Sequence, residues 1–203
     1  FWFWIWREQP LRESLSLLYR ELADYCEAKY SLLTQHTDPE KALPPLLVRQ
    51  QKAVDLITQC YQQMHMLSAH HNNEYKRLLR AFQEALDLQE HISVSLHQPE
   101  EVQKLVERSH AEQVIRWNAR TVAERLRVLA DDILYHRLPT RFSMDKQIGT
   151  LEKIARQHPD NPVGQFCYWH FSRIARVLRT QRPLYARDLM ADKQRRLPLI
   201  PAL

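Results

Sequence analysis

The chain has 203 residues, a hydrophobic fraction of 44% and a net charge of +5. That much apolar content is sufficient for a folded core and excludes a chain that is disordered throughout. The two glycines, Gly149 and Gly164, are too few for the turns of a β-sandwich or for a glycine-rich nucleotide-binding loop. Because helix-forming residues dominate the rest, the composition favours an all-α fold.

Prolines and capping residues mark where the first helices begin and end. We predict a helix from Pro10 to about residue 35, a restart with Asp38 as N-cap and Pro39 in the first turn, and a break at Pro44-Pro45. A second long helix then runs to about residue 70. Apolar residues spaced three and four apart define the predicted inward faces: Leu11, Leu15, Leu18, Leu22, Cys26, Tyr30 and Leu33 on the first helix, and Leu47, Val54, Ile57, Tyr61 and Met64 on the second.

The remaining sequence predicts further helices separated by turns. A third helix ends near residue 96, a short one begins at Pro99, and a capping-box pattern at Ser109 starts the next, which runs to about residue 137. Ser143 is expected to cap a short helix to about residue 157. Asn161 then caps a last helix that ends near residue 182, before Pro183. Since no strand-like alternation is present, we predict an antiparallel helical bundle of about five to seven helices.

The N-terminal segment is unusually apolar. Its first six residues include Trp2, Trp4 and Trp6, and Arg7 follows at once. Tryptophan prefers the headgroup region of a membrane and arginine marks the cytoplasmic side, so the segment is typical of the end of a transmembrane helix. Spanning a bilayer takes about 20 residues. We therefore interpret residues 1–6 as the end of a preceding transmembrane helix, with a buried helix turn as the alternative.

The C-terminal region carries most of the positive charge. Residues 173–196 contain eight arginines and lysines against two aspartates, and Lys193, Arg195 and Arg196 stand just before an apolar tail, 197–203. A basic run ahead of an apolar segment is what the positive-inside rule expects before a membrane entry. We expect residues 7–196 to form a cytoplasmic helical domain and 197–203 to begin the connection to the next membrane segment. The expected partners are the protein's own transmembrane segments and lipid headgroups.

The run from Phe166 to Phe171 is apolar on nearly every side of a helix. Such a segment is buried on more than one side, or it faces a partner or a membrane. Core burial is one interpretation. The other is an interface that includes Phe166, Trp169 and Phe171 and that joins two copies of the chain or contacts its membrane domain. The arginines that follow also allow a basic and aromatic nucleic-acid surface, which we rank lower because the positive charge is confined to the end before the apolar tail.

The cysteines and histidines match no known type of site. Cys26, Cys60 and Cys167 are widely spaced and odd in number, which favours buried thiols in a reducing compartment. Motifs of hydrolases, zinc enzymes and phosphate sites are absent from the sequence, so we predict no catalytic residue, metal or cofactor. One cluster fits a helix face poorly, and we interpret its histidines as solvated or at the core edge: Cys60, Met64, His65, Met66, His70 and His71.

Four segments of the chain carry a resemblance to a known family. They are FWFWIWREQPLRESLSLLYRELADYCEAKYSLLTQ, EALDLQEHISVSLHQPEEVQKLVERSHAE, RQHPDNPVGQFCYWHFSRIARVLRTQ and PLYARDLMADKQRRLPLIPAL. On these segments the chain resembles inner-membrane proteins of the fusaric-acid-resistance-like (FUSC) family, and the resemblance covers its whole length.

The resemblance implies a cytoplasmic domain of a bacterial inner-membrane transporter. Family members resemble duplicated transporters in which transmembrane helices and a cytoplasmic domain alternate twice, and this chain would be the first cytoplasmic domain. Relatives in the wider family export aromatic carboxylic acids. The family offers no established catalytic or binding motif in this region, so no site residues are carried over and no ligand is assigned.

Three functions are compared on this basis. A transporter's accessory domain, with a structural, oligomerisation or regulatory role and no catalysis, predicts that both ends of the chain emerge at one face of the bundle. A basic module for nucleic acid or an acidic protein predicts binding that salt weakens steeply. A metalloenzyme built on the cluster around Cys60 predicts a stoichiometric metal ion. We favour the first function and expect no binding of nucleic acid.

Overall fold

A computed structural model describes residues 7–35, 38–67, 73–93, 99–108 and 110–196, with the side chains at 39, 99–101, 105 and 180–196 left out. Within these ranges the chain forms seven helices and no strand, so the predicted all-α fold is confirmed. The helices are α2 (Gln9–Thr34), α3 (Pro39–Leu67), α4 (Asn73–Ser93), α5 (Pro99–Arg108), α6 (Glu112–Leu134), α7 (Asp145–Gln157) and α8 (Pro162–Arg196).

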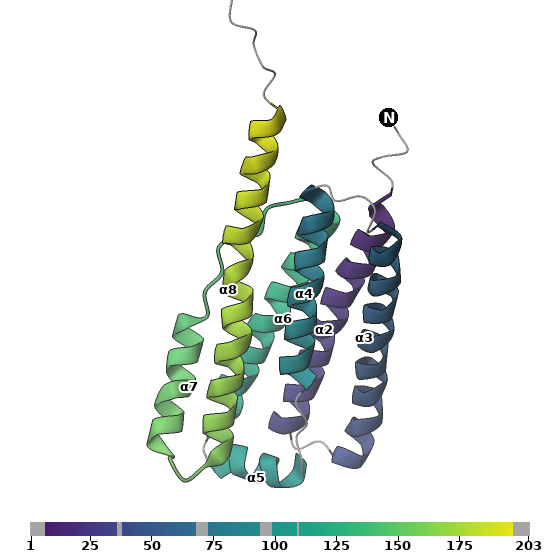
Figure 1. Cartoon of the computed structure of the whole chain (residues 1–203). Coiled ribbons are helices and arrows are strands. Elements are labelled where there is room, and N and C mark those ends of the chain that lie inside the picture. The colour runs from purple at the N-terminus through teal and green to yellow at the C-terminus, as the bar shows by residue number, and fades with distance from the viewer. Residues whose placement is uncertain (1–6, 36–37, 68–72, 94–98, 109, 197–203) are drawn as a thin grey trace, which may run out of the picture.

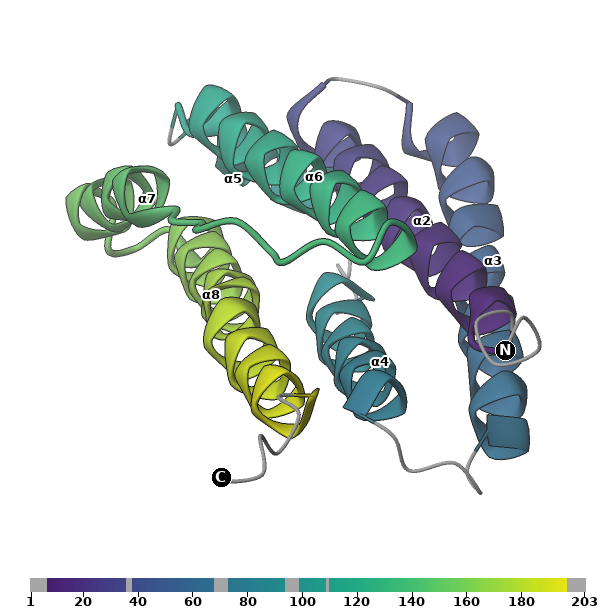
Figure 2. The same cartoon turned by 90° about the horizontal axis from the view of Figure 1, so that it is seen from above.

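Consecutive long helices run antiparallel, and α5 lies across one end of the bundle (Figure 1). Seen from above, α3, α2 and α6 form one row, α4 and α8 form a second row, and α7 lies beside α8 (Figure 2). Helix α2 packs most extensively against α6, then against α3, and it also contacts α4. It is therefore the central helix of the bundle.

Helix α2 is buried around most of its circumference. Its predicted seam from Leu11 to Leu33 is buried as expected, but so are polar residues on its other sides, among them Arg12, Glu21 and Lys29. The fully buried Tyr19 donates a hydrogen bond from its hydroxyl to the carbonyl of Ala81 on α4 at 2.9 Å. A buried polar group is costly unless it is paired, so these side chains tie α2 to its neighbours.

Helix α3 is continuous where the sequence predicts a break. Pro44 and Pro45 lie inside it, in the second turn after Pro39. Each proline removes one intrahelical hydrogen bond, and the carbonyls left without a donor are those of Glu40 and Lys41. Both of those residues are exposed, so water can satisfy their carbonyls. The helix therefore passes the two prolines instead of restarting after them.

The predicted inward face of α3 is also wrong for most of its members. Leu47, Val54 and Tyr61 are exposed. Met64 is buried as predicted, and the residues buried with it are Ala53, Cys60 and Leu67. Helix α3 carries apolar residues on two faces with the same spacing, and periodicity alone does not say which one meets the core. The small side chains of Ala53 and Cys60 let α3 approach α2 on their side.

The predicted caps Asp38 and Asn161 are present, whereas the N-cap residue of α7 is Met144, one position after the predicted Ser143. The backbone N–H of Glu40 donates to Asp38 at 3.1 Å, that of Asp145 to the Ser143 hydroxyl at 3.2 Å, and that of Val163 to Asn161 at 3.0 Å. The predicted cap Ser109 lies outside the described residues, and α6 begins after Ala111 without a side-chain cap.

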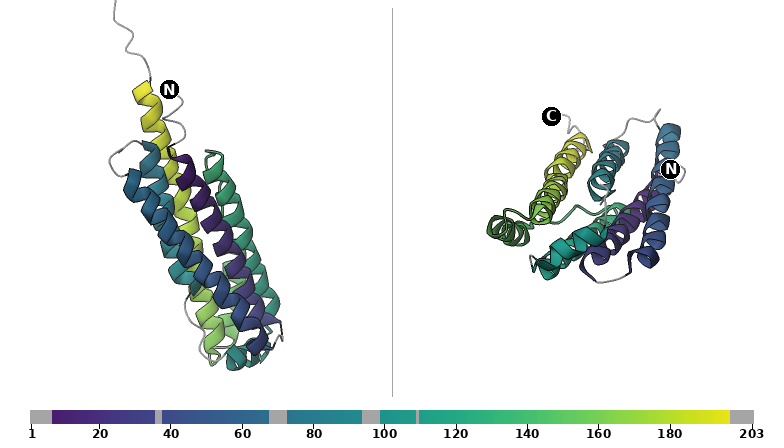
Figure 3. Two further views of the ribbon diagram at one scale, coloured as in Figure 1. Left: turned by 90° about the vertical axis from the view of Figure 1, so that its right-hand side faces the viewer. Right: turned by 90° about the horizontal axis from the view of Figure 1, so that it is seen from below.

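Helix α8 continues to Arg196, beyond the predicted end before Pro183. One proline costs a helix one hydrogen bond, and strong helix formers such as Leu184, Ala186 and Leu189 follow it. The last turns of α8 project beyond the bundle, and the start of α2 lies at that same end (Figures 1 and 3). No described helix combines the length and the apolar character that crossing a membrane needs.

Phe171 belongs to the core and not to a surface, which corrects the interpretation of that residue as part of an interface. It is fully buried, and its ring centroid lies 4.7 Å from that of Tyr30 on α2. The helical run is thus buried on one side only, because Trp169, two residues earlier, is 49% exposed.

We expect Phe171→Ala to lower the free energy of unfolding by about 3–5 kcal/mol, because it leaves a cavity between α2 and α8. Denaturant unfolding followed by circular dichroism measures this change. Trp169→Ala on the exposed side of the same helix is the matched control, with an expected loss below about 1 kcal/mol. Equal losses for the two variants would contradict the assignment of Phe171 to the core.

Candidate functional site

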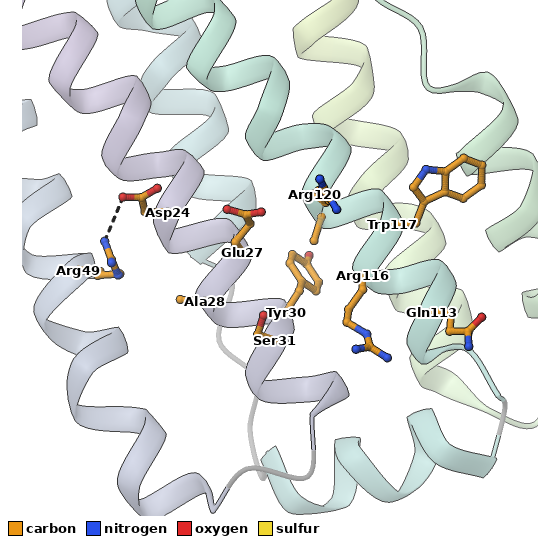
Figure 4. A pocket seen from close by; sticks show the side chains of 11 residues that line it. Asp24, Glu27, Ala28, Tyr30, Ser31, Arg49, Gln113, Arg116, Trp117 and Arg120 are labelled. Carbon is orange, nitrogen blue, oxygen red and sulfur yellow. Dashed lines mark hydrogen bonds and ion pairs between the residues drawn. The ribbon is translucent and has the colours of Figure 1, made fainter.

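An open groove of about 770 Å³ is lined by α2, α3 and α6 (Figure 4). Asp24 and Glu27 come from α2, Arg49 comes from α3, and Arg116 and Trp117 come from α6. The buried residues Tyr30 and Ala119 also line it, so a ligand in the groove would meet apolar as well as charged atoms.

The carboxylates of the groove are engaged in ion pairs. Asp24 accepts from Arg49 at 3.4 Å and from Arg127 at 2.8 Å, and Glu27 is paired with the same Arg127. Arg49 also binds the buried Glu21 at 3.1 Å. These pairs join α2 to α3 on one side and to α6 on the other. Their first role is therefore to hold the walls of the groove together.

The α6 wall of the groove is more available to a ligand. Arg116 is exposed and, among the described residues, has no ion-pair partner. Next to it, Trp117 is 40% exposed, and the ammonium of Lys146 lies 6.0 Å from its ring centroid. An arginine beside an aromatic ring binds a planar anion through charge and stacking. Burial raises the pKa of Tyr30, so its phenol stays protonated at neutral pH.

A second group of polar side chains is buried between α2, α4 and α8. Lys29 donates a hydrogen bond to the carbonyl of Ile92, and burial lowers the pKa of Lys29 to about 8. Burial, with the charge of Lys29 as a smaller cause, lowers the pKa of His170 to about 4. His170 packs on the ring of Phe166 with centroids 4.2 Å apart. At neutral pH this imidazole is therefore uncharged and part of the packing.

All three cysteines are free and buried, as the sequence predicts. Burial raises the pKa of Cys26, Cys60 and Cys167 to about 12. Because the thiolate is the reactive form of cysteine, these thiols are inert at neutral pH. They act as small apolar residues in the seams between helices.

The residues expected to flank a membrane fall mostly outside the described part of the chain. Trp2, Trp4 and Trp6 are not described. Arg7 is exposed just before α2. The remaining three are described as helical backbone in the last turns of α8, without their side chains: Lys193, Arg195 and Arg196.

The aromatic residues of α8 divide between core and surface. Phe166 is partly buried against the core, and Trp169 is exposed with the guanidinium of Arg173 stacked 4.0 Å from its ring centroid. The structure thus brings an aromatic ring and a cation together on the outer face of α8. An interface built on Phe166 and Trp169 stays a prediction.

The cluster that begins at Cys60 is dispersed over the sides of α3. Cys60 and Met64 face the core, whereas His65 and Met66 are exposed. His70 and His71 lie outside the described residues. Within the described ranges, no three side chains of histidine, cysteine, aspartate or glutamate are grouped as a metal site would require.

Comparison with known proteins adds what the geometry leaves open. Residues 1–189 match the family described as FUSC-like inner membrane protein yccS. The chain belongs to this family of inner-membrane proteins. Over 197 residues, 97% of its length, the chain is 92% identical to Uncharacterized protein YhfK of Escherichia coli strain K12. The chain spans only 28% of that relative's length. No solved structure matches it.

The family membership agrees with the resemblance predicted from the sequence, whereas the groove was not predicted. Asp24, Arg49 and Arg116 lie on three helices and follow no motif. Each appears in the sequence as an ordinary charged residue on a solvated face. These residues indicate a groove only if oppositely charged side chains lie at matching positions along neighbouring helices. Those positions are known only once the helices are packed.

We expect stability to fall as the pH is lowered from about 6.5 to about 4, in part because of His170. Its pKa of about 4 in the fold lies below the usual 6.5, so the unfolded chain takes up a proton first and is favoured. This contributes about 3 kcal/mol of lost stability below pH 4. In His170→Gln that part of the dependence should vanish, whereas His158→Gln removes an exposed imidazole and serves as control. Unfolding curves measured across this pH range for both variants would reveal identical slopes if the assignment is wrong.

Proposed function

We propose that this chain is a cytoplasmic domain of a longer bacterial inner-membrane protein, and that it braces the membrane segments on either side of it. For the longer protein we propose transport of the efflux kind, with aromatic acids or related compounds as substrates, in line with the resemblance to FUSC exporters. The domain itself takes a structural part in this and catalyses no reaction. The relative from Escherichia coli, more than three times as long as the aligned segment, supports the view that the chain is one part of a larger protein.

One observation carries this proposal. The start of α2 and the end of α8 lie at the same end of the bundle (Figures 1 and 3), as a domain inserted between two membrane segments requires. An even number of antiparallel long helices produces this arrangement: α2, α3, α4, α6, α7 and α8 alternate in direction, and α5 crosses the far end. A chain with one long helix fewer would present its ends at opposite ends of the bundle.

A structural role is supported by how the bundle is tied together. Arg12 on α2 is buried and binds Glu74 on α4 at 2.9 Å, close to the end where both described ends lie. Glu21 joins α2 to α3 through Arg49 and Lys52. A force applied to α2 is thereby shared with neighbouring helices, which suits a domain that holds two membrane segments in register.

The side of the membrane can be tested by labelling single cysteines in the intact protein. The three cysteines of this chain are buried, so without the substitution this domain should not react with a membrane-impermeant maleimide. Lys153→Cys places a thiol on the exposed side of α7. We expect it to react in inverted inner-membrane vesicles and not in intact spheroplasts. Reaction in spheroplasts would show that the domain faces the periplasm and overturn the proposed topology.

Binding of lipid headgroups can be tested with vesicles of phosphatidylglycerol. We expect the triple variant Lys193→Gln, Arg195→Gln, Arg196→Gln to bind about 100-fold more weakly in low salt, because each basic residue near an anionic surface contributes about 1 kcal/mol. Sedimentation with vesicles measures this binding. A control with the same change in charge neutralises exposed residues of α7: Lys146, Lys153 and Arg156. Tighter binding of a 20-base-pair DNA duplex (about two helical turns) than of the vesicles would favour the nucleic-acid module instead.

A further inference from the structure

Helix α3 exposes an apolar stripe along the side of the bundle. Its large residues are Leu43, Leu47, Val54 and Tyr61, which are 40%, 53%, 40% and 66% exposed. Gln51 and Thr58 fill the helix turns between them. We call these six residues the α3 stripe. They follow one another at intervals of three and four residues, so they lie along one side of the helix.

The six residues of the α3 stripe carry no charge, although the exposed Asp55 borders them and accepts a hydrogen bond from Gln51 at 2.9 Å. The outer face of α6, in contrast, carries Arg116, Arg120 and Glu124, and the exposed face of α8 carries the cation stacked on Trp169. Single exposed apolar residues are ordinary, but a run of them without charge is the composition of an interface core. Lys52, the lysine nearest in sequence, points away and binds Glu21 on α2 at 2.5 Å.

The position of α3 limits what can cover the stripe. Helix α3 forms the edge of its row, opposite α7, and packs on α2 and to a lesser extent on α4 (Figure 2). It runs along the long axis of the bundle, whereas both described ends lie at one end of that axis (Figure 1). In the proposed topology the stripe therefore faces sideways, parallel to the membrane plane, toward a lateral neighbour.

We propose that the α3 stripe joins this chain to a second copy of itself, with the two α3 helices parallel and in register. An uncharged surface meets its own copy without repulsion, as an isologous interface requires. The parallel direction rests on the proposed function, because two copies anchored in one membrane must present the same end to it. Leu47, Val54 and Tyr61 are spaced seven residues apart, which is the repeat of a two-helix coiled coil.

The area of this contact is limited. From Leu43 to Tyr61 the stripe is about 27 Å long, at 1.5 Å per residue. One helix pair of this length buries less than the roughly 800 Å² per partner of a standard interface. The pairing is therefore weak for a free domain and is favoured when both copies are confined to one membrane, which raises their effective concentration.

Single-cysteine cross-linking of the full-length protein in isolated inner membranes tests the pairing. Leu47→Cys, Val54→Cys and Tyr61→Cys are each expected to form a disulfide-linked dimer on mild oxidation, because parallel, in-register helices bring each residue opposite its own copy. Gln59→Cys, exposed on another side of α3, is the matched control and should remain monomeric. In an antiparallel pair, Val54→Cys would form dimers by itself, whereas Leu47→Cys would be linked only to Tyr61→Cys when the two variants are mixed. That result would overturn the proposal.

Adding a charge to the stripe distinguishes disulfides formed at a defined interface from disulfides formed by random collision. Adding Val54→Lys to Leu47→Cys should lower the dimer yield about tenfold or more, since it opposes like charges across the seam. Adding Gln59→Lys should leave the yield unchanged. Any of three results would overturn the proposal: an unchanged dimer yield with Val54→Lys, dimers formed through Trp169→Cys instead of the stripe, or no dimer from any cysteine in the stripe. The maleimide labelling of Lys153→Cys is independent of these yields, so failure of the topology and failure of the interface are distinguishable.

Discussion

The burial of α2 is the constraint on which the rest of the structure depends. This central helix contacts α3, α4, α5 and α6, so residues around most of its circumference leave water. Three of them are charged, and each finds a partner on a neighbouring helix: Arg12 binds Glu74, Glu21 binds Arg49, and Lys29 donates to the carbonyl of Ile92. A buried charge without a partner costs several kcal/mol. These pairs therefore fix the position of each neighbouring helix along the axis of α2, which apolar packing alone would define less uniquely.

The candidate surfaces follow from that arrangement. The groove exists because the pairs of Asp24 with Arg49 and with Arg127 hold α3 and α6 on either side of α2 at fixed heights. Glu21 pairs with Arg49 and Lys52 on one flank of α3, Ala53 and Cys60 face the core, and the α3 stripe lies outside. A helix with two apolar faces thus gains one defined outer face, and that face is available to another molecule.

Much of the fold could be predicted from the sequence, but less of the surfaces could. Helix starts at Asp38 and Asn161 are local, since a cap depends on residues one or two positions away, and both are present. The continuation of α3 through Pro44 was not predictable in this way, because it depends on whether exposed carbonyls can be solvated. The orientation of α3 depends on Glu21, about 30 residues earlier. The family was apparent from whole segments of sequence, whereas the groove requires three helices to be placed first.

The length of α8 connects the domain to its proposed place at the membrane. Helix α8 has 35 residues and α2 has 26, so at 1.5 Å per residue α8 is about 13 Å longer. This extra length projects at the end where α2 begins (Figure 1). Deeper in the bundle, α8 is held by the contact of Phe171 with Tyr30 and by its packing on α4 and α7. A continuous helix anchored in this way transmits displacement of its outer end to the core. In the proposed topology, the membrane segment after α8 would therefore transmit its movement to α2 through a single layer of side chains. Helix α2 in turn starts beside the membrane segment that precedes it.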